Sequence, residues 1–105
     1  MNVPAVTAPG GLAAHREAIR GVLASYGVEA AGVFGSVARG QATDSSDLDL
    51  IVQFSPGVER DLIRLGEELS RVAGATVDVV DADVVRERAH RTGVGLSILA
   101  ETVPL

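Results

Sequence analysis

The amino-acid sequence predicts an α+β domain in which a small mixed β-sheet of three to four strands is backed by helices. Helical and strand-like hydrophobic patterns alternate along the chain in the order helix, strand, strand, helix, strand, helix, with no internal repeat. The 105 residues, 47% of them hydrophobic, are enough for one domain with a real core but not for two. We therefore expect residues 1–105 to form a single domain.

The first half of the chain contains one predicted helix and two predicted strands. Residues 1–10 hold two prolines and a glycine without periodicity, which indicates a loose lead-in. Apolar residues then recur near helical spacing over residues 12–26, and Gly27 follows where a helix C-cap would lie. The segments 28–34 and 48–54 are rich in β-branched and large apolar residues, so each is expected to form a strand.

The second half is expected to contain a helix, a strand and two more helices. A turn at residues 55–57 precedes a predicted helix over 58–72, whose leucines share one stripe. Residues 75–81 form the third predicted strand, and a helix follows over 83–91. A short apolar helix is expected to continue through Leu99.

Composition and charge exclude several functional classes. The sequence has no cysteine, which excludes disulfides, thiol nucleophiles and cysteine-ligated zinc, so a bound metal would have oxygen ligands. The formal net charge of −5 and the aromatic fraction of 3% argue against a general nucleic-acid binder. Because no apolar run reaches membrane-spanning length and no signal peptide is recognisable, we expect a soluble, cytoplasmic protein.

Aspartates interrupt two of the predicted strands. Asp47 and Asp49 lie two residues apart, so their side chains share one face of the second strand, opposite Leu48 and Leu50. Two carboxylates this close repel each other unless a cation lies between them, and Mg²⁺ prefers such oxygen ligands. Asp78 stands among valines in the third strand; if that strand lies beside the second, three carboxylates could hold one or two metal ions.

Other interpretations of the aspartates stay open on this pattern alone. A half-exposed strand commonly alternates polar and apolar residues, so Asp47 and Asp49 could be purely structural. Asp81 and Asp83 precede a helical segment and are interpreted as N-caps rather than ligands. An EF-hand is excluded, because neither its glycine nor its glutamate occurs at the required spacing.

A glycine–serine pair follows the first predicted strand. Gly35 and Ser36 are expected to open a short helix, where backbone N–H groups and a hydroxyl could receive an anion. The Walker motif, with its Gly-Lys-Ser/Thr ending, is absent. Arg39 could add positive charge beside a phosphate or could be solvated. Together with the carboxylates, this arrangement predicts a site for a metal ion and a triphosphate.

The stretch GSVARGQATDSSDLDLIV, residues 35–52, resembles the signature of the nucleotidyltransferase superfamily, which has the polymerase-β-like fold. In that signature a Gly-Ser pair is followed by Ser-Asp-x-Asp-Leu. The small size and the ending AETVPL make the chain most similar to the minimal nucleotidyltransferases, the MntA-type antitoxins that pair with HEPN-domain ribonuclease toxins. The resemblance covers about residues 15–105.

The resemblance implies a role for each matching residue. The implied nucleotide-binding residues are Gly35, Ser36, Arg39 and Ser46. The implied catalytic residues, which would also bind two Mg²⁺ ions, are Asp47, Asp49 and Asp78. Asp78 would either complete the metal site or take the proton from the acceptor hydroxyl. Members of this kind are expected to transfer AMP from ATP to a tyrosine of the partner toxin and so silence it.

Size bears on the nature of the acceptor. Larger relatives carry an additional domain that holds an aminoglycoside or an RNA end, so for this short chain a protein partner in a hetero-oligomer is expected, and nucleic acid is not. A basic segment could contact that partner or the nucleotide, or form a solvated face; it comprises Arg86, Arg88, His90 and Arg91. Two alternatives remain: an antitoxin that binds its toxin sterically without catalysis, and a nucleotidyltransferase that acts on RNA or is itself a toxin.

Overall fold

Helices and strands alternate through the part of the chain that the computed structural model describes, which is residues 6, 11–41, 47–95 and 102–105. In chain order the elements are α1 (Gly11–Ser25), β1 (Val28–Phe34), α2 (Gly35–Ala38), β2 (Leu48–Phe54), α3 (Leu62–Ala73), β3 (Val77–Asp81), α4 (Ala82–Thr92) and β4 (Val103–Pro104). The expected short helix at the glycine–serine pair is confirmed as α2. The helix expected through Leu99 falls outside the described residues.

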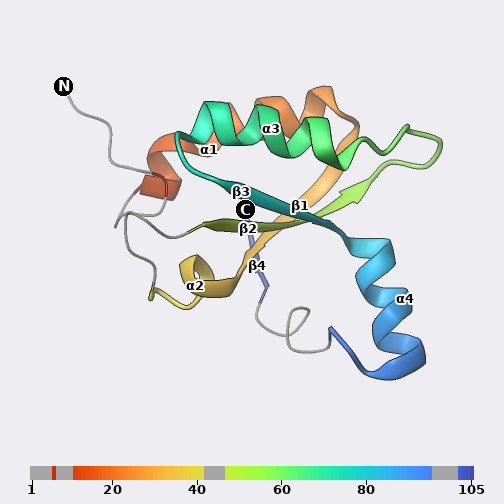
Figure 1. The fold of residues 1–105 in the computed structure, drawn as a ribbon. Helices are drawn as coiled ribbons and strands as arrows, with labels where there is room; N and C mark the ends of the chain where they lie inside the picture. Colours follow the sequence, from red (N-terminus) through yellow and green to blue (C-terminus); the bar gives the residue numbers. More distant parts are fainter. Residues whose placement is uncertain (1–5, 7–10, 42–46, 96–101) are drawn as a thin grey trace.

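The four strands form one mixed sheet in the order β3-β2-β1-β4. β2 runs parallel to β3, whereas β1 runs antiparallel to both β2 and β4. Helices α1 and α3 cover one face of this sheet, and α2 and α4 lie at opposite ends of it, away from α1 and α3 (Figure 1). The predicted α+β class is therefore confirmed. None of the described helices combines the length and apolar character needed to cross a membrane.

The core lies between the sheet and the pair α1 and α3. Alternate residues of β2 face it: Leu48, Leu50 and Val52 are fully buried, whereas Asp49 and Gln53 point the other way and are half-buried. Burying each such aliphatic side chain contributes about 1.5–3 kcal/mol. The core cluster consists of Val6, Ile19, Leu23, Val33, Leu48, Leu50, Val52, Phe54, Leu65, Leu69, Ala73, Val77 and Leu105. Val6 anchors the N-terminal lead-in at that point, and the remainder of the lead-in falls outside the description.

Two element boundaries differ from those expected. Helix α3 begins at Leu62 rather than at residue 58, because the Asp61 side chain accepts a hydrogen bond of 3.0 Å from the backbone N–H of Arg64 and so caps the helix there. Strand β3 begins at Val77 rather than at residue 75. The helix ends at Ala73, followed by Gly74 in the left-handed conformation, as the sequence predicted.

Asp81 and Asp83 have different roles at the start of α4. The prediction that Asp81 is an N-cap is confirmed, since it accepts a 2.9 Å hydrogen bond from the backbone N–H of Asp83. The same prediction was wrong for Asp83, which lies inside the first turn of the helix. Arg60 pairs with both carboxylates, at 2.7 Å from Asp81 and 2.9 Å from Asp83, and thereby ties the loop before α3 to α4.

The Arg60 pairs lead to a stability prediction. Asp81 is 5% exposed, so Asp81→Ala removes both a helix cap and the partner of a cation, and we expect a loss of about 2 kcal/mol in the free energy of unfolding. Asp83→Ala should cost clearly less, because its pair is exposed to solvent. Urea denaturation of both variants measures the difference; equal losses would contradict this account of α4.

Candidate active site

The two strands that carry the aspartates lie side by side. Asp49 of β2 is in register with Asp78 of β3, and neighbouring strands are about 4.8 Å apart. Leu48 and Leu50 occupy the buried face of β2, so Asp49 projects from the opposite face. The condition set by the sequence, that the third strand must lie beside the second, is therefore met.

Asp49 is the electrostatic centre of this group. Burial raises the pKa of the Asp49 carboxyl above its usual 3.8, and the negative charges of Asp78 and Asp47 raise it further, while the positive charge of Arg39 lowers it. Asp47 immediately precedes β2 and is exposed, and Asp78 is exposed as well. The fold thus brings the three carboxylates and Arg39 within electrostatic range of one another.

The end of β1 lies close to the Asp49 carboxylate. Phe34 is the cross-strand partner of Asp49, and Gly35 follows with a positive φ of 74°. A Cβ added at Gly35 would overlap the Asp49 carboxylate, so another residue at this position would both strain the backbone and displace that carboxylate. The sequence pattern predicts only a phosphate contact for Gly35, whereas its closeness to Asp49 arises from the pairing of β1 with β2.

Backbone hydrogen bonds shape the segment that follows Gly35. The N–H of Arg39 donates to the carbonyl of Gly35 at 3.1 Å, and the N–H of Gln41 donates to the carbonyl of Ser36 at 2.9 Å. The Arg39 side chain donates to the Gln41 side chain at 3.2 Å. Gly35, Ser36 and Arg39 therefore belong to one compact turn beside Asp49, whereas Ser46 falls outside the described residues.

The carboxylates fit a divalent cation in their chemistry. All three are hard oxygen donors of the kind that Mg²⁺ prefers, and a cation between them would remove the repulsion that raises the pKa of Asp49. Within the described ranges, no three acidic or histidine side chains are already close enough together to hold a metal ion. The three aspartates would therefore have to draw closer around a bound ion.

A groove lies on the same face of the sheet, farther along β2. It has a volume of about 420 Å³ and is lined by Ala30, Ala31, Gly32, Ile51, Gln53, Ala82, Arg86, Thr102 and Pro104. Arg86 donates a 2.5 Å hydrogen bond to Gln53 and lies 3.4 Å from Asp83. Arg86, one residue of the basic segment, thus links α4 to β2 of the sheet.

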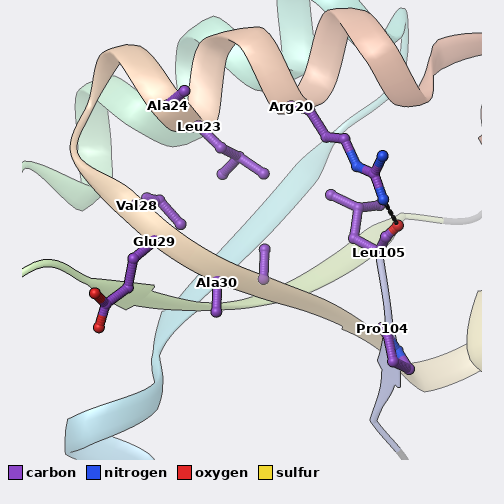
Figure 2. Close-up of a pocket in the computed structure, with 9 residues that line it drawn as sticks. Arg20, Leu23, Ala24, Val28, Glu29, Ala30, Pro104 and Leu105 are labelled. Carbon is purple, nitrogen blue, oxygen red and sulfur yellow. Dashed lines mark hydrogen bonds between the residues drawn. The ribbon is translucent and has the colours of Figure 1, made fainter.

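A separate pocket of about 370 Å³ lies between α1 and β1, on the face covered by helices (Figure 2). There Arg20 donates a 2.8 Å hydrogen bond to the carbonyl oxygen of Leu105, and Leu23 and Val28 supply an apolar wall. None of the residues lining this pocket is one of the candidate aspartates. It therefore takes no part in the candidate active site.

Comparison with known proteins agrees with this geometry. Residues 15–104 match the family model described as nucleotidyltransferase domain. The chain is 34% identical over 94 residues to the protein adenylyltransferase MntA of Thermococcus cleftensis, covering 88% of this chain and 86% of that protein. It is 43% identical over 60 residues to an inferred protein adenylyltransferase of Methanocaldococcus jannaschii; the match spans 56% of this chain and 64% of that protein's length.

Solved structures share the fold as well. One, described as an inferred minimal nucleotidyltransferase, superposes with a TM-score of 0.66 at 41% identity, over 90% of this chain and 92% of the other. A chain from the crystal structure of a toxin–antitoxin with AMP-PNP superposes with a TM-score of 0.55 at 23% identity, over 69% of this chain and 57% of the other. With its sheet order, its in-register aspartates and the matched residues 15–104, this chain belongs to the nucleotidyltransferase domain family.

Proposed function

We propose that this chain is a cytoplasmic, Mg²⁺-dependent protein adenylyltransferase that transfers AMP from ATP to a hydroxyl of a HEPN-domain ribonuclease toxin, with tyrosine as the expected acceptor. Transfer would silence the toxin, so the chain would act as its antitoxin. The observation that carries the proposal is the position of Asp49, between Gly35 at the end of β1 and Asp78 on β3. The likeness to protein adenylyltransferase MntA supports it.

The turn after β1 would bind the triphosphate. Gly35 and Ser36 form the start of α2, where backbone N–H groups and the serine hydroxyl would donate to phosphate oxygens. Arg39 lies in the same turn and would add positive charge beside the phosphates. Its charge already lowers the pKa of Asp49. Ser46 is proposed as a further nucleotide contact from the resemblance alone.

The aspartates would hold the metal and handle the proton. Asp47 and Asp49 would bind Mg²⁺, and we propose two ions. When bound, these ions would neutralise phosphate charge and align the triphosphate. The acceptor oxygen forms a bond to the α-phosphorus while the bond from that phosphorus to the bridging oxygen breaks, and pyrophosphate leaves with the electron pair. Asp78, exposed at the site, would either complete the metal site or take the proton of the hydroxyl.

Removal of an aspartate tests the transfer reaction. We expect Asp47→Ala and Asp49→Ala to lower AMP transfer by at least 100-fold, an order of magnitude typical for lost transition-state charge stabilisation, while the far-UV circular dichroism of the fold is retained. The measurement is intact-mass spectrometry of the protein encoded by the adjacent gene after incubation with this chain, ATP and Mg²⁺. Retained transfer by either variant would sink the proposal.

The same experiment separates the alternatives. Tight binding of the adjacent-gene protein without nucleotide and without added mass would indicate a steric antitoxin. Incorporation of labelled AMP into RNA rather than protein would indicate an RNA nucleotidyltransferase.

Gly35 offers a prediction with a matched control. Gly35 and Gly40 both have positive φ, 74° and 70°, but an added Cβ at Gly35 meets Asp49 whereas one at Gly40 meets open space. Each alanine variant should lose about 1 kcal/mol of stability from backbone strain. Only Gly35→Ala should also lose AMP transfer, because it displaces the Asp49 carboxylate. Equal activity in the two variants would show that the contact with Asp49 is unimportant.

The charge of Asp49 predicts a pH-dependent stability. The pKa of Asp49 in the native state is raised above the unfolded value of 3.8, so the native state favours the protonated carboxyl. The stability that this protonated form provides is present in full below pH 3.8 and is lost as pH rises through the native pKa. At pH 7 the ionised group therefore destabilises the metal-free protein. We expect Asp49→Asn to raise the melting temperature at pH 7 without Mg²⁺, and the gain to vanish near pH 3. A lower melting temperature for Asp49→Asn at pH 7 would contradict this electrostatic account.

A further inference from the structure

β3 has a free outer edge beside the candidate site. It is the last strand of the sheet, and within the described residues it pairs with β2 alone. A groove of about 500 Å³ runs along this edge against α3, lined by Leu62, Ile63, Gly66, Glu67, Ser70, Val77, Asp78 and Val79. Since unpaired strand edges readily accept another strand, a free edge that ends in a candidate catalytic carboxylate is a docking position for an extended segment.

The α3 wall of this groove contains an exposed apolar residue. Ile63 is 78% exposed, more than any other large hydrophobic residue of the described chain. Gly66 lies in the middle of the helix, where glycine weakens the helix. A Cβ at Gly66 would make only ordinary contacts, 3.6 Å from the Val77 carbonyl oxygen and 3.9 Å from Val79 Cγ2, so packing does not require glycine there. The glycine does keep the groove free of a side chain.

The order of the strands places the acceptor on this side. Gly35 lies at the end of β1, Asp49 on the central β2, and Asp78 on the outer β3. In-line displacement requires the attacking oxygen and the leaving pyrophosphate on opposite sides of the α-phosphorus. With the triphosphate at Gly35, the acceptor hydroxyl would therefore approach from the β3 edge, and the groove lies along this edge on the α3 side.

Charge indicates the chemistry of the occupant. The charged residues that line the groove are Glu67 and Asp78, both acidic, on a chain of net charge −5. A ribonuclease binds RNA phosphates with lysine and arginine, so a protein of that class has basic surface to match.

We infer that the β3 edge groove receives an extended, apolar and basic segment of the acceptor protein, which pairs with β3, packs on Ile63 and presents its hydroxyl at Asp78. This inference rests on the proposed function and deepens it. The groove gives this domain a surface with which to select its acceptor.

Binding measurements test the inference independently of catalysis. The probe is the purified protein encoded by the adjacent gene, titrated calorimetrically without nucleotide. Ile63→Lys removes the apolar contact and adds a repelling charge, and we expect it to weaken binding at least tenfold. Gly66→Leu, which fills the groove, should weaken binding similarly. The matched control is Val84→Lys on α4, a residue 53% exposed, which should bind like the wild type.

The binding results can be distinguished from a failure of the proposed AMP transfer. The stabilisation by ATP and Mg²⁺ should be the same in Ile63→Lys as in the wild type, since Ile63 lies outside the nucleotide site. Equal affinity of Ile63→Lys and the wild type, or no binding by the wild type, would overturn the inference. Wild-type binding that is weakened by Ile63→Lys but brings no AMP transfer would support the docking surface while refuting the proposed activity.

Discussion

The in-register pairing of β2 with β3 is the constraint on which the site depends. It sets Asp49 beside Asp78, a repulsive arrangement that nothing local favours. The buried face of β2 enforces it: a slip of one residue would turn Leu48, Leu50 and Val52 to the open face and bring polar residues into the core. Burial of the apolar side chains on one face of β2 therefore offsets the cost of the carboxylate repulsion on the other face.

The two aspartates of β3 lie in different environments. Asp81 is buried, caps α4 and pairs with Arg60, so its charge is compensated within the fold. Asp78, at the other end of the strand, is exposed, and its negative charge raises the pKa of Asp49. Among the described residues, Asp81 thus has an arginine partner within the fold, whereas the candidate catalytic residue Asp78 is exposed, and sequence alone does not display that difference.

What the sequence could predict is mostly local. Alternation along residues 48–54 predicted a strand with Asp49 opposite the leucines, and the glycine–serine pair predicted α2. The start of α3 was placed too early because Pro56 and Gly57 suggested an immediate helix, whereas Asp61 caps it later. The adjacency of β3 and β2, the contact of Gly35 with Asp49 and the groove at Ile63 depend on tertiary packing, which no local pattern encodes.

One face of the sheet packs against the core, and the other carries the candidate active site. The face under α1 and α3 holds the core, whereas the opposite face carries Asp49, whose ionised form disfavours the native state at neutral pH. Any ligand that supplies positive charge there relieves this penalty, and its binding free energy adds to the stability of the fold. Because Asp49 lies between the end of β1 and the edge of β3, a nucleotide bound at Gly35 and a partner bound along β3 would meet at the same carboxylate. The carboxylate whose ionised form disfavours the fold is thus the point where the two proposed ligands would converge.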